Sequence, residues 1–413
     1  MTHDSVHWWE RLISVFGLFA LIGIAFALSE NKKRVPWRLV TAGVGMQVVF
    51  ALLVLKTSVG RATFSLLNDG VTKLLSFTTD GARFVFGDYL DMKFTVALNV
   101  LPTIIFFSSL MAVLYHLRVM QPLVKGLAWL MQRTLGTSGA ETLSCAANIF
   151  VGQTEAPLVV RPYVDLMTRS ELMAVMCGGF ATVAGGVMAA YVGMLRAHFP
   201  DIAGHLIAAS VMSAPAALVC AKIMVPELGS PVTAGKLELP DARPDANLVD
   251  AAARGAGEGM MLALNVGAML IAFMALVAMV NALVGVIWHD MTLERLFGWA
   301  FWPLAWLMGV PAKDCSTVAT LLGEKTVLNE FVAYLHLSRI VGEGGSGLGE
   351  RATIISTYAL CGFSNFGSIA IQIGGLGGIA PSRRSDIARL GLRAMIAGSL
   401  ACFMTAAVAG IVV

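Results

Sequence analysis

The chain has 413 residues, of which 57% are hydrophobic and only 13% charged, and its formal net charge is +3 at pH 7. Because soluble domains carry about 25% charged residues, this composition excludes a water-soluble enzyme, a secreted domain and a disordered protein. The small net charge also argues against a nucleic-acid partner. What remains is a polytopic membrane protein, and at about 20 residues per span the length allows roughly eight to twelve crossings.

The long apolar stretches predict transmembrane helices, because the strands of a membrane barrel alternate in polarity over about ten residues. We therefore predict an all-α polytopic membrane protein with eight transmembrane helices, two re-entrant helical hairpins, one interfacial helix and an inverted repeat. The predicted spans are residues 8–29, 37–55, 94–117, 170–195, 202–225, 260–288, 353–373 and 390–412. The six cysteines form no CxxC pair, which favours buried thiols over disulfides.

The basic segment 32–38, between the first two spans, sets the orientation. Positive charges collect in cytoplasmic loops, so we expect the N-terminus outside and this loop inside. Residues 60–87 then mix apolar and charged side chains and are too polar to span. We expect them to form an amphipathic helix along the membrane surface.

Two regions consist of short apolar pieces separated by polar breaks, and each predicts a re-entrant hairpin. Residues 121–162 are broken around TLGTSGA at 134–140, and residues 293–335 around GVPAKD at 309–314. Irregular backbone at membrane depth is tolerated only where it is buried in protein or lines a water-filled cavity. Between the two regions, residues 226–258 carry four prolines and many charges, so we expect a cytoplasmic loop there.

These features predict six consecutive segments. The first two spans form residues 1–58, and the interfacial helix and third span, as scaffold or oligomer contact, form residues 59–120. A first transport half with hairpin 1 and spans four and five follows at 121–225, and then the cytoplasmic loop at 226–258. A scaffold sixth span covers 259–292, and a second transport half with hairpin 2 and the last two spans covers 293–413.

The two halves repeat one motif order. The first hairpin region contains GQTEAP at 152–157 and the next span contains GFATVAG at 179–185, whereas the second contains LNEF at 328–331, followed by GFSNFGS at 362–368. Each half thus has a hairpin with an amide and an acid close together, followed by a helix interrupted by glycine, phenylalanine and a small polar residue. Broken segments at corresponding positions of two halves indicate the substrate site of a secondary transporter.

The unpaired N–H and C=O groups at helix breaks are able to hold polar solutes and ions that lipid cannot. An acid at the bilayer centre costs about 2.5–3.5 kcal/mol on insertion scales, so Glu155 and Glu330 are expected to face a polar cavity or a partner. A structural interpretation is open for each feature alone: the glycine runs as packing faces, and the glutamates as partners of Arg161 or Lys325. Their joint occurrence, twice and in the same order, favours a functional site.

At these residues the sequence resembles the concentrative nucleoside transporters over roughly residues 90–412. The motifs that carry the resemblance are GQTEAPL at 152–158 with RPY at 161–163, SVMSAPA at 210–216, NEFVAY at 329–334, and SNFGSI at 364–369 with IGGL at 373–376. The resemblance implies a homotrimer in the bacterial inner membrane, with membrane lipid around it and a nucleoside site between the two hairpins and the two broken helices.

Residue roles follow from the resemblance by motif. It implies that Gln153, Thr154 and Glu155 contact the nucleobase, that Glu330, Asn365 and Ser368 hold the ribose, and that Phe363 packs near the base. It also implies a sodium site formed by the side chains of Asn148 and Thr182 with backbone carbonyls near Asn148, Val151 and Val183. No cofactor is expected, sodium is the expected coupling ion, and the expected substrates are nucleosides of the uridine, cytidine and adenosine class. No cluster of basic residues suggests a nucleotide phosphate.

The leading hypothesis is sodium-coupled nucleoside symport by alternating access, not an enzyme. The alternative is a proton-coupled nucleoside or nucleobase carrier, in which Glu155 carries the proton. An intramembrane enzyme is less well supported, because no base with a plausible partner accompanies a nucleophile. A channel remains open, although paired inverted hairpins favour a gated carrier.

Overall fold

The computed structural model describes residues 8–92, 95–235, 245–288, 291–342 and 347–413, and every regular element in these ranges is helical. In this part of the chain, seven helical stretches are long and apolar enough to cross a membrane. The remaining predicted span, 353–373, which is the seventh in chain order, is divided into two shorter helices by a break. The prediction of an all-helical polytopic membrane protein is therefore confirmed.

The N-terminal part contains two spans and a long amphipathic helix. Helix α1 (Trp8–Ala27) and α2 (Trp37–Lys56) are joined through η1 (Lys32–Arg34), and α3 (Ser58–Phe86) follows. The Thr57 hydroxyl accepts a 2.9 Å hydrogen bond from the Gly60 N–H and so caps α3. Residues predicted as an interfacial helix thus form a helix, whereas its position at the membrane surface stays a prediction.

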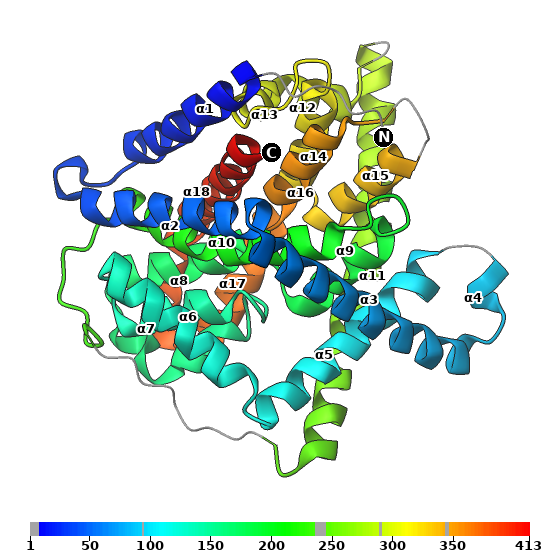
Figure 1. Cartoon of the computed structure of the whole chain (residues 1–413), viewed down its shortest axis with the longest axis horizontal. Helices are drawn as coiled ribbons and strands as arrows, with labels where there is room; N and C mark the ends of the chain where they lie inside the picture. Colours follow the sequence, from blue (N-terminus) through cyan, green and yellow to red (C-terminus); the bar gives the residue numbers. More distant parts are fainter. Residues whose placement is uncertain (1–7, 93–94, 236–244, 289–290, 343–346) are drawn as a thin grey trace.

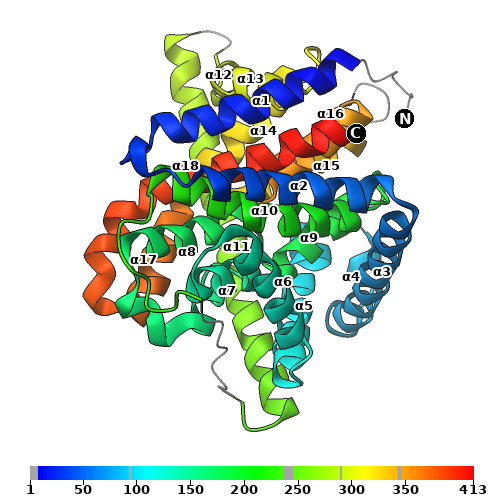
Figure 2. The same cartoon turned by 60° about the vertical axis from the view of Figure 1, so that its left-hand side comes forward.

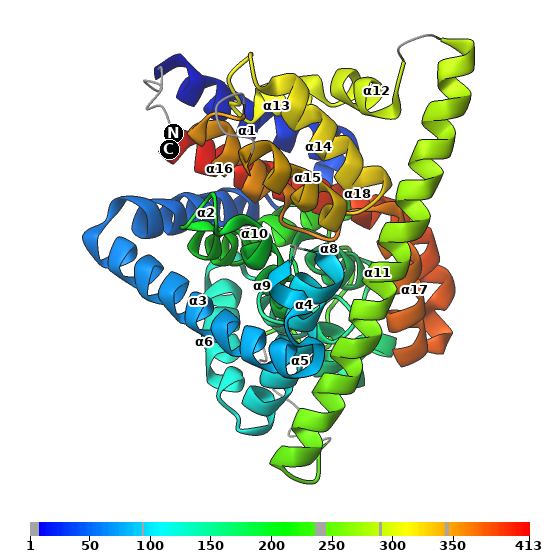
Figure 3. The same ribbon diagram turned by 90° about the vertical axis from the view of Figure 1, so that its right-hand side faces the viewer.

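Two helices form a separate pair at one side of the molecule. After α4 (Tyr89–Met92), the third span consists of η2 (Val96–Val100) and α5 (Leu101–His116), and its predicted start at residue 94 lies outside the described residues. Helix α5 packs on α11 (Leu248–Ile287), whose 40 residues span about 60 Å at 1.5 Å per residue. Figure 3 shows α11 running along this edge of the molecule.

The two predicted hairpin regions each contain more elements than expected. The first holds α6 (Met120–Leu135), α7 (Gly139–Ala147) and η3 (Ala156–Leu166), and the second holds α12 (Leu293–Ala300), α13 (Trp302–Leu307), α14 (Cys315–Val327) and α15 (Glu330–Gly342). The predicted breaks at 134–140 and 309–314 separate α6 from α7 and α13 from α14. A second break follows in each region, at 148–155 and at 328–329, and there the sequence motifs lie.

The repeat continues through the rest of each half. A helix broken into two pieces follows each hairpin. After hairpin 1 the pieces are α8 (Arg169–Ala181) and α9 (Gly185–Leu195), and after hairpin 2 they are α16 (Glu350–Leu360) and α17 (Phe366–Ile379). An unbroken helix then closes each half, α10 (Ile202–Met224) and, after η4 (Pro381–Arg383), α18 (Arg384–Val412). Helices α8, α10 and α18 pack on one another, and α10 and α18 cross the centre of the molecule (Figures 1 and 2).

Three predicted boundaries were wrong. The predicted loop 226–258 ends earlier, because α11 begins at Leu248 with Asn247 as its N-cap. The boundary was predicted from the charged residues alone. These charges are compatible with a helix, because Arg254 pairs with Asp245 at 2.6 Å and with Glu258, one helical turn away, at 2.8 Å. The hairpins continue beyond residues 162 and 335, to Leu166 and Gly342. Segment η3 is kinked at Val160 but does not end there, and α15 runs through residue 335 without a break.

Candidate functional site

The breaks of the two interrupted helices contact each other directly. The Phe363 N–H donates to the Thr182 carbonyl at 3.4 Å, and the Ser364 hydroxyl donates to the Phe180 carbonyl at 2.8 Å. The approach requires glycine, because a Cβ on Gly362 would lie 2.7 Å from the Phe180 carbonyl oxygen. The two halves therefore meet at the points where their helices are open.

Glu330 is the centre of a buried hydrogen-bond network. Its carboxylate accepts from the Tyr191 hydroxyl at 3.1 Å and from the Asn365 amide at 2.9 Å. The Asn365 side-chain oxygen in turn accepts from the Ser368 N–H at 2.8 Å and caps α17. Glu330 is only 4% exposed. Its environment consists of polar groups from hairpin 2, α9 and α17, and it does not pair with Lys325, whose ammonium donates to the Ala359 carbonyl at 2.8 Å.

Gln153, in the second break of hairpin 1, extends this network. Its Nε2 lies 3.3 Å from the Ser368 hydroxyl, and its Oε1 accepts from Gln372 at 3.1 Å. Thr154 packs on α17, because a Cβ on Gly375 would lie 3.3 Å from its methyl group. The predicted base-contacting and ribose-contacting groups from opposite halves of the chain are thus neighbours.

Two predicted residues are less enclosed. Glu155 is exposed and Phe363 is partly buried. Within the described part of the chain no ion pair joins Glu155 to Arg161, so the pairing considered for this acid is not seen there. Both residues lie beside the network and not within its hydrogen bonds.

The predicted cation ligands lie where two helices end. Asn148 is the C-cap of α7 and Thr182 is the C-cap of α8. Each residue is only 1% exposed. The Gly185 N–H donates to the Phe150 carbonyl at 3.1 Å, which brings the two helix ends together. Helix C-termini carry partial negative charge and unpaired carbonyls, which favour a cation.

The donor set at this point fits a small hard cation. The Thr182 hydroxyl donates to the Gly178 carbonyl at 3.0 Å, which leaves its oxygen lone pairs available. The Asn148 amide nitrogen is buried without a hydrogen-bond partner in the described residues. In the same residues, no backbone N–H donates to the carbonyl of Val151 or Val183. The Thr182 hydroxyl oxygen and the carbonyls of Val151 and Val183 therefore keep lone pairs without a donor in these residues, whereas the unpartnered atom of Asn148 is its nitrogen.

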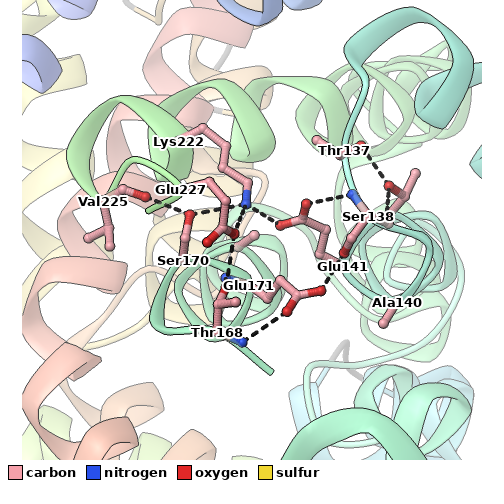
Figure 4. A network of polar contacts seen from close by, with 12 residues as sticks. Thr137, Ser138, Ala140, Glu141, Thr168, Ser170, Glu171, Lys222, Val225 and Glu227 are labelled. Carbon is pink, nitrogen blue, oxygen red and sulfur yellow. Dashed lines mark hydrogen bonds and ion pairs between the residues drawn. The ribbon is translucent and has the colours of Figure 1, made fainter. Parts of the chain in front are cut away.

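A buried charge network fixes the start of hairpin 1 to the helices behind it (Figure 4). Lys222 of α10 pairs with Glu141 of α7 at 2.7 Å and with Glu227 at 3.3 Å, and it donates to the Ser170 hydroxyl of α8 at 3.0 Å. The Ser138 hydroxyl before α7 donates to Glu171 of α8 at 2.5 Å. Lys222 and Glu141 are 3% and 1% exposed, so the pair is desolvated and depends on these hydrogen bonds.

Glu227 lies in the loop after α10, at the exposed side of this network. Burial acts to raise its pKa, but the Lys222 ammonium and the hydrogen bonds from Gly229 and Thr168 outweigh burial and lower the pKa below its ordinary value. The carboxylate is therefore ionised at neutral pH and counters part of the Lys222 charge.

Two residues in the network were absent from the sequence prediction, Tyr191 and Gln372. Gln372 had a detectable signal, because Asn365, Ser368 and Gln372 follow a spacing of three and four residues and share one face of a helix that is otherwise apolar. Tyr191 had none, since a tyrosine in an apolar helix is common and its partner Glu330 is distant in sequence.

Known proteins resemble the chain along nearly its whole length. Residues 205–410 match the family described as Na+ dependent nucleoside transporter C-terminus, residues 16–89 match the corresponding N-terminus family, and residues 97–197 match a gate family described as nucleoside recognition. An uncharacterized transporter of Haemophilus influenzae is 47% identical over 411 residues, which are 97% of each chain. Sodium/nucleoside cotransporter 1 of Rattus norvegicus is 44% identical over 97% of this chain and 64% of its own length.

Solved structures agree with the fold. CNTnw in an inward-facing substrate-bound state matches with a TM-score of 0.92 at 44% identity, covering 98% of both chains. A CNTnw variant in an outward-facing state matches with a TM-score of 0.91 at 43% identity, covering 97% of both chains.

Proposed function

The chain belongs to the concentrative nucleoside transporter family and is a multi-pass membrane protein, and we propose that it couples inward sodium movement to nucleoside uptake across the bacterial inner membrane. The observation that carries this proposal is the network in which Glu330, Asn365 and Ser368 lie beside Gln153. It joins both hairpins and a broken helix, the arrangement that a secondary transporter uses at its substrate site.

The chemistry of these groups suits a nucleoside. A carboxylate accepts two hydrogen bonds and so matches the vicinal hydroxyls of a ribose, which supports ribose binding by Glu330 with Asn365 and Ser368. The amide of Gln153 and the hydroxyl of Thr154 supply donors and acceptors for the edge of a base, Glu155 adds an acceptor, and the ring of Phe363 supplies an apolar surface. We assign these roles as proposals.

Sodium is the proposed coupling ion, bound by the side chains of Asn148 and Thr182 with the carbonyls of Val151 and Val183. These are neutral oxygen groups at two helix C-termini, and neither side chain titrates near pH 7. A sodium ion that moves inward with the nucleoside gains about 2.3 kcal/mol per 100 mV of membrane potential. The alternative, a proton carried by Glu155, is kept because Glu155 is exposed beside the site.

Uptake of radiolabelled uridine and adenosine into proteoliposomes, with a sodium gradient, a proton gradient or none, tests this function. We expect accumulation against a gradient only with sodium. Uptake that persists when choline replaces sodium and collapses without a pH gradient would contradict the sodium assignment and favour Glu155 as proton carrier.

Two variants sharpen the test of the ion site. Asn148→Ala and Thr182→Ala are expected to raise the sodium concentration for half-maximal uptake, because each removes one oxygen ligand. Thr357→Ala is the matched control, since Thr357 is also buried and its hydroxyl also bonds the carbonyl four residues earlier, at 2.9 Å. An equal sodium shift in all three variants would argue against the proposed ligands.

We also propose a homotrimer. Large apolar side chains of α11, including Ile271, Leu283 and Val286, are exposed in the single chain, and a second copy or lipid covers such a face in a membrane. Native mass spectrometry of the detergent-solubilised protein tests this proposal, and a purely monomeric species would reject it.

A further inference from the structure

Gln372 is a buried amide of α17, in the second half of the chain, and both of its hydrogen-bond partners lie in the first half. It is 1% exposed, and its Nε2 lies 3.0 Å from the Met176 carbonyl oxygen of α8 and 3.1 Å from Gln153 Oε1. The sequence motifs assign it no role.

The Met176 carbonyl determines how both amides are turned. A backbone carbonyl oxygen only accepts hydrogen bonds, so the Gln372 atom that faces it is the nitrogen. The same nitrogen reaches Gln153, and therefore the Gln153 atom that faces it is the oxygen. This chain of donors and acceptors leaves Gln153 Nε2 directed to the other side, where the Ser368 hydroxyl lies 3.3 Å away.

A glycine makes this close approach possible. A Cβ on Gly179 of α8 would lie 2.6 Å from Gln372 Nε2 and 2.9 Å from the Gln153 Cβ, distances that real Cβ atoms do not adopt. The Gln372 Oε1 is buried without a partner in the described residues, so the orientation is held by the two bonds of its nitrogen. The local packing is therefore built around this one arrangement of the amide pair.

We propose that Gln372 is a positioning residue that fixes the polarity with which Gln153 reads the nucleobase, so that Gln153 presents an N–H donor and not an oxygen acceptor to the site. This inference rests on the proposed function, since it takes Gln153 as a contact of the base. It follows that the base atom facing Gln153 is an acceptor, a carbonyl oxygen or an unprotonated ring nitrogen, and that an amino group at that point is rejected.

Gln372→Met tests the inference, because methionine has a similar volume and no donor. Without the donor, the Gln153 amide is free to rotate and to offer either its nitrogen or its oxygen. Uridine and cytidine present opposite donors and acceptors at N3 and at position 4. The ratio of their apparent affinities is expected to move about threefold to tenfold toward one in Gln372→Met, as for the loss of one neutral hydrogen bond. The ratio for uridine and 2′-deoxyuridine is expected to stay unchanged.

Gln47→Met is the matched control. Gln47 is also a buried glutamine whose Nε2 bonds one backbone carbonyl, that of Met212 at 3.2 Å, and one side chain, that of Thr405 at 3.1 Å, away from the site. It is expected to lose a comparable amount of stability and to keep both ratios.

Three results would overturn the inference: no base preference in the wild type, an unchanged ratio in Gln372→Met, or the same change in Gln47→Met. A change of the base and ribose ratios together in Gln372→Met would also overturn it, since that reports collapse of the site. A wild-type protein that transports no nucleoside would instead reject the proposed function.

Discussion

At the scale of single residues, Glu330 offers the most direct test of the site. Its two carboxylate oxygens are held by Tyr191 and Asn365 from two different helices, so its position does not depend on hairpin 2 alone. In the proposed role, a bound ribose would add hydrogen bonds to a group that is already oriented. The Glu330 side chain therefore has little conformational entropy left to lose when the substrate binds.

Glu330→Gln is expected to weaken binding of ribonucleosides tenfold or more, because hydrogen bonds to a charged acceptor contribute about 1.5–3 kcal/mol and a neutral amide accepts more weakly. The loss should be smaller for 2′- or 3′-deoxy analogues, which do not use both bonds. Competition against labelled uridine uptake measures the affinities.

Glu324→Gln is the control, because Glu324 is a buried acid of the same hairpin that pairs with His336 at 2.9 Å outside the site. An equal loss for ribo- and dideoxy-nucleosides in Glu330→Gln would indicate that Glu330 has a structural role.

The sequence indicated which residues meet in this hydrogen-bond network better than it indicated their contacts. Glu330, Asn365 and Gln153 were recognisable because amides and acids are costly in apolar helices, whereas Ser368 was named from the family resemblance alone. Their grouping follows from the crossing of two breaks more than 180 positions apart, at Phe180–Ser364, which no local pattern encodes. The orientation of Gln153 depends in addition on a backbone carbonyl, and a sequence does not show which carbonyls are unpaired.

At the scale of elements, hairpin 1 is anchored by charge and not by apolar packing alone. Helix α7 has nine residues, too few to be stable by itself, and all nine are buried. It is joined to the helices behind it by the ion pair between Glu141 and Lys222 and by the hydrogen bond from the Ser138 hydroxyl to Glu171. The hairpin that carries Gln153 therefore depends on a buried ion pair for its position.

Lys222→Met is expected to destabilise the protein by about 3–5 kcal/mol, because it leaves the buried Glu141 charge without its partner. The double variant Lys222→Met/Glu141→Gln should recover much of this loss. Thermal unfolding in detergent measures both.

Arg169→Met provides the comparison, since Arg169 pairs with Glu30 at 2.9 Å in a half-exposed position where about 1 kcal/mol or less is expected. A double variant no more stable than Lys222→Met would show that the charge pair is not what anchors α7.

The element order was predictable and the element ends were not. Apolar length identified the spans, and polar breaks identified both hairpin regions. The start of α11 at Leu248 was missed because its first three turns are charged, and a charged segment with satisfied pairs is compatible with helix as well as loop. The break between α6 and α7 was predicted, but the second break at 148–155 was not, so the separation of α7 from η3 was missed.

At the scale of the whole molecule, α18 relates the two hairpins. Its N-terminal end lies beside the end of hairpin 1, where Arg383 donates to the Met167 carbonyl at 2.6 Å. Its C-terminal end lies beside the start of hairpin 2, where a Cβ on Gly410 would lie 2.8 Å from the Met308 carbonyl oxygen. The 29 residues of α18 span about 44 Å, enough to cross a bilayer. In Figures 1 and 2, α7 lies in the lower half of the molecule and α12–α14 lie near the top.

The two hairpins should therefore open to opposite faces of the membrane, and single cysteines on the wild-type background test this. Ser230→Cys marks hairpin 1, because it is exposed in the loop whose Thr233 carbonyl accepts from the Gly139 N–H at 3.0 Å. Ala312→Cys is exposed in the break before α14 and marks hairpin 2. A membrane-impermeant maleimide is expected to label the first only from the cytoplasm and the second only from outside, with little background because the six native cysteines are buried. Labelling of both positions from the same face would reject the inverted topology, and with it the placement of the site between two oppositely directed hairpins.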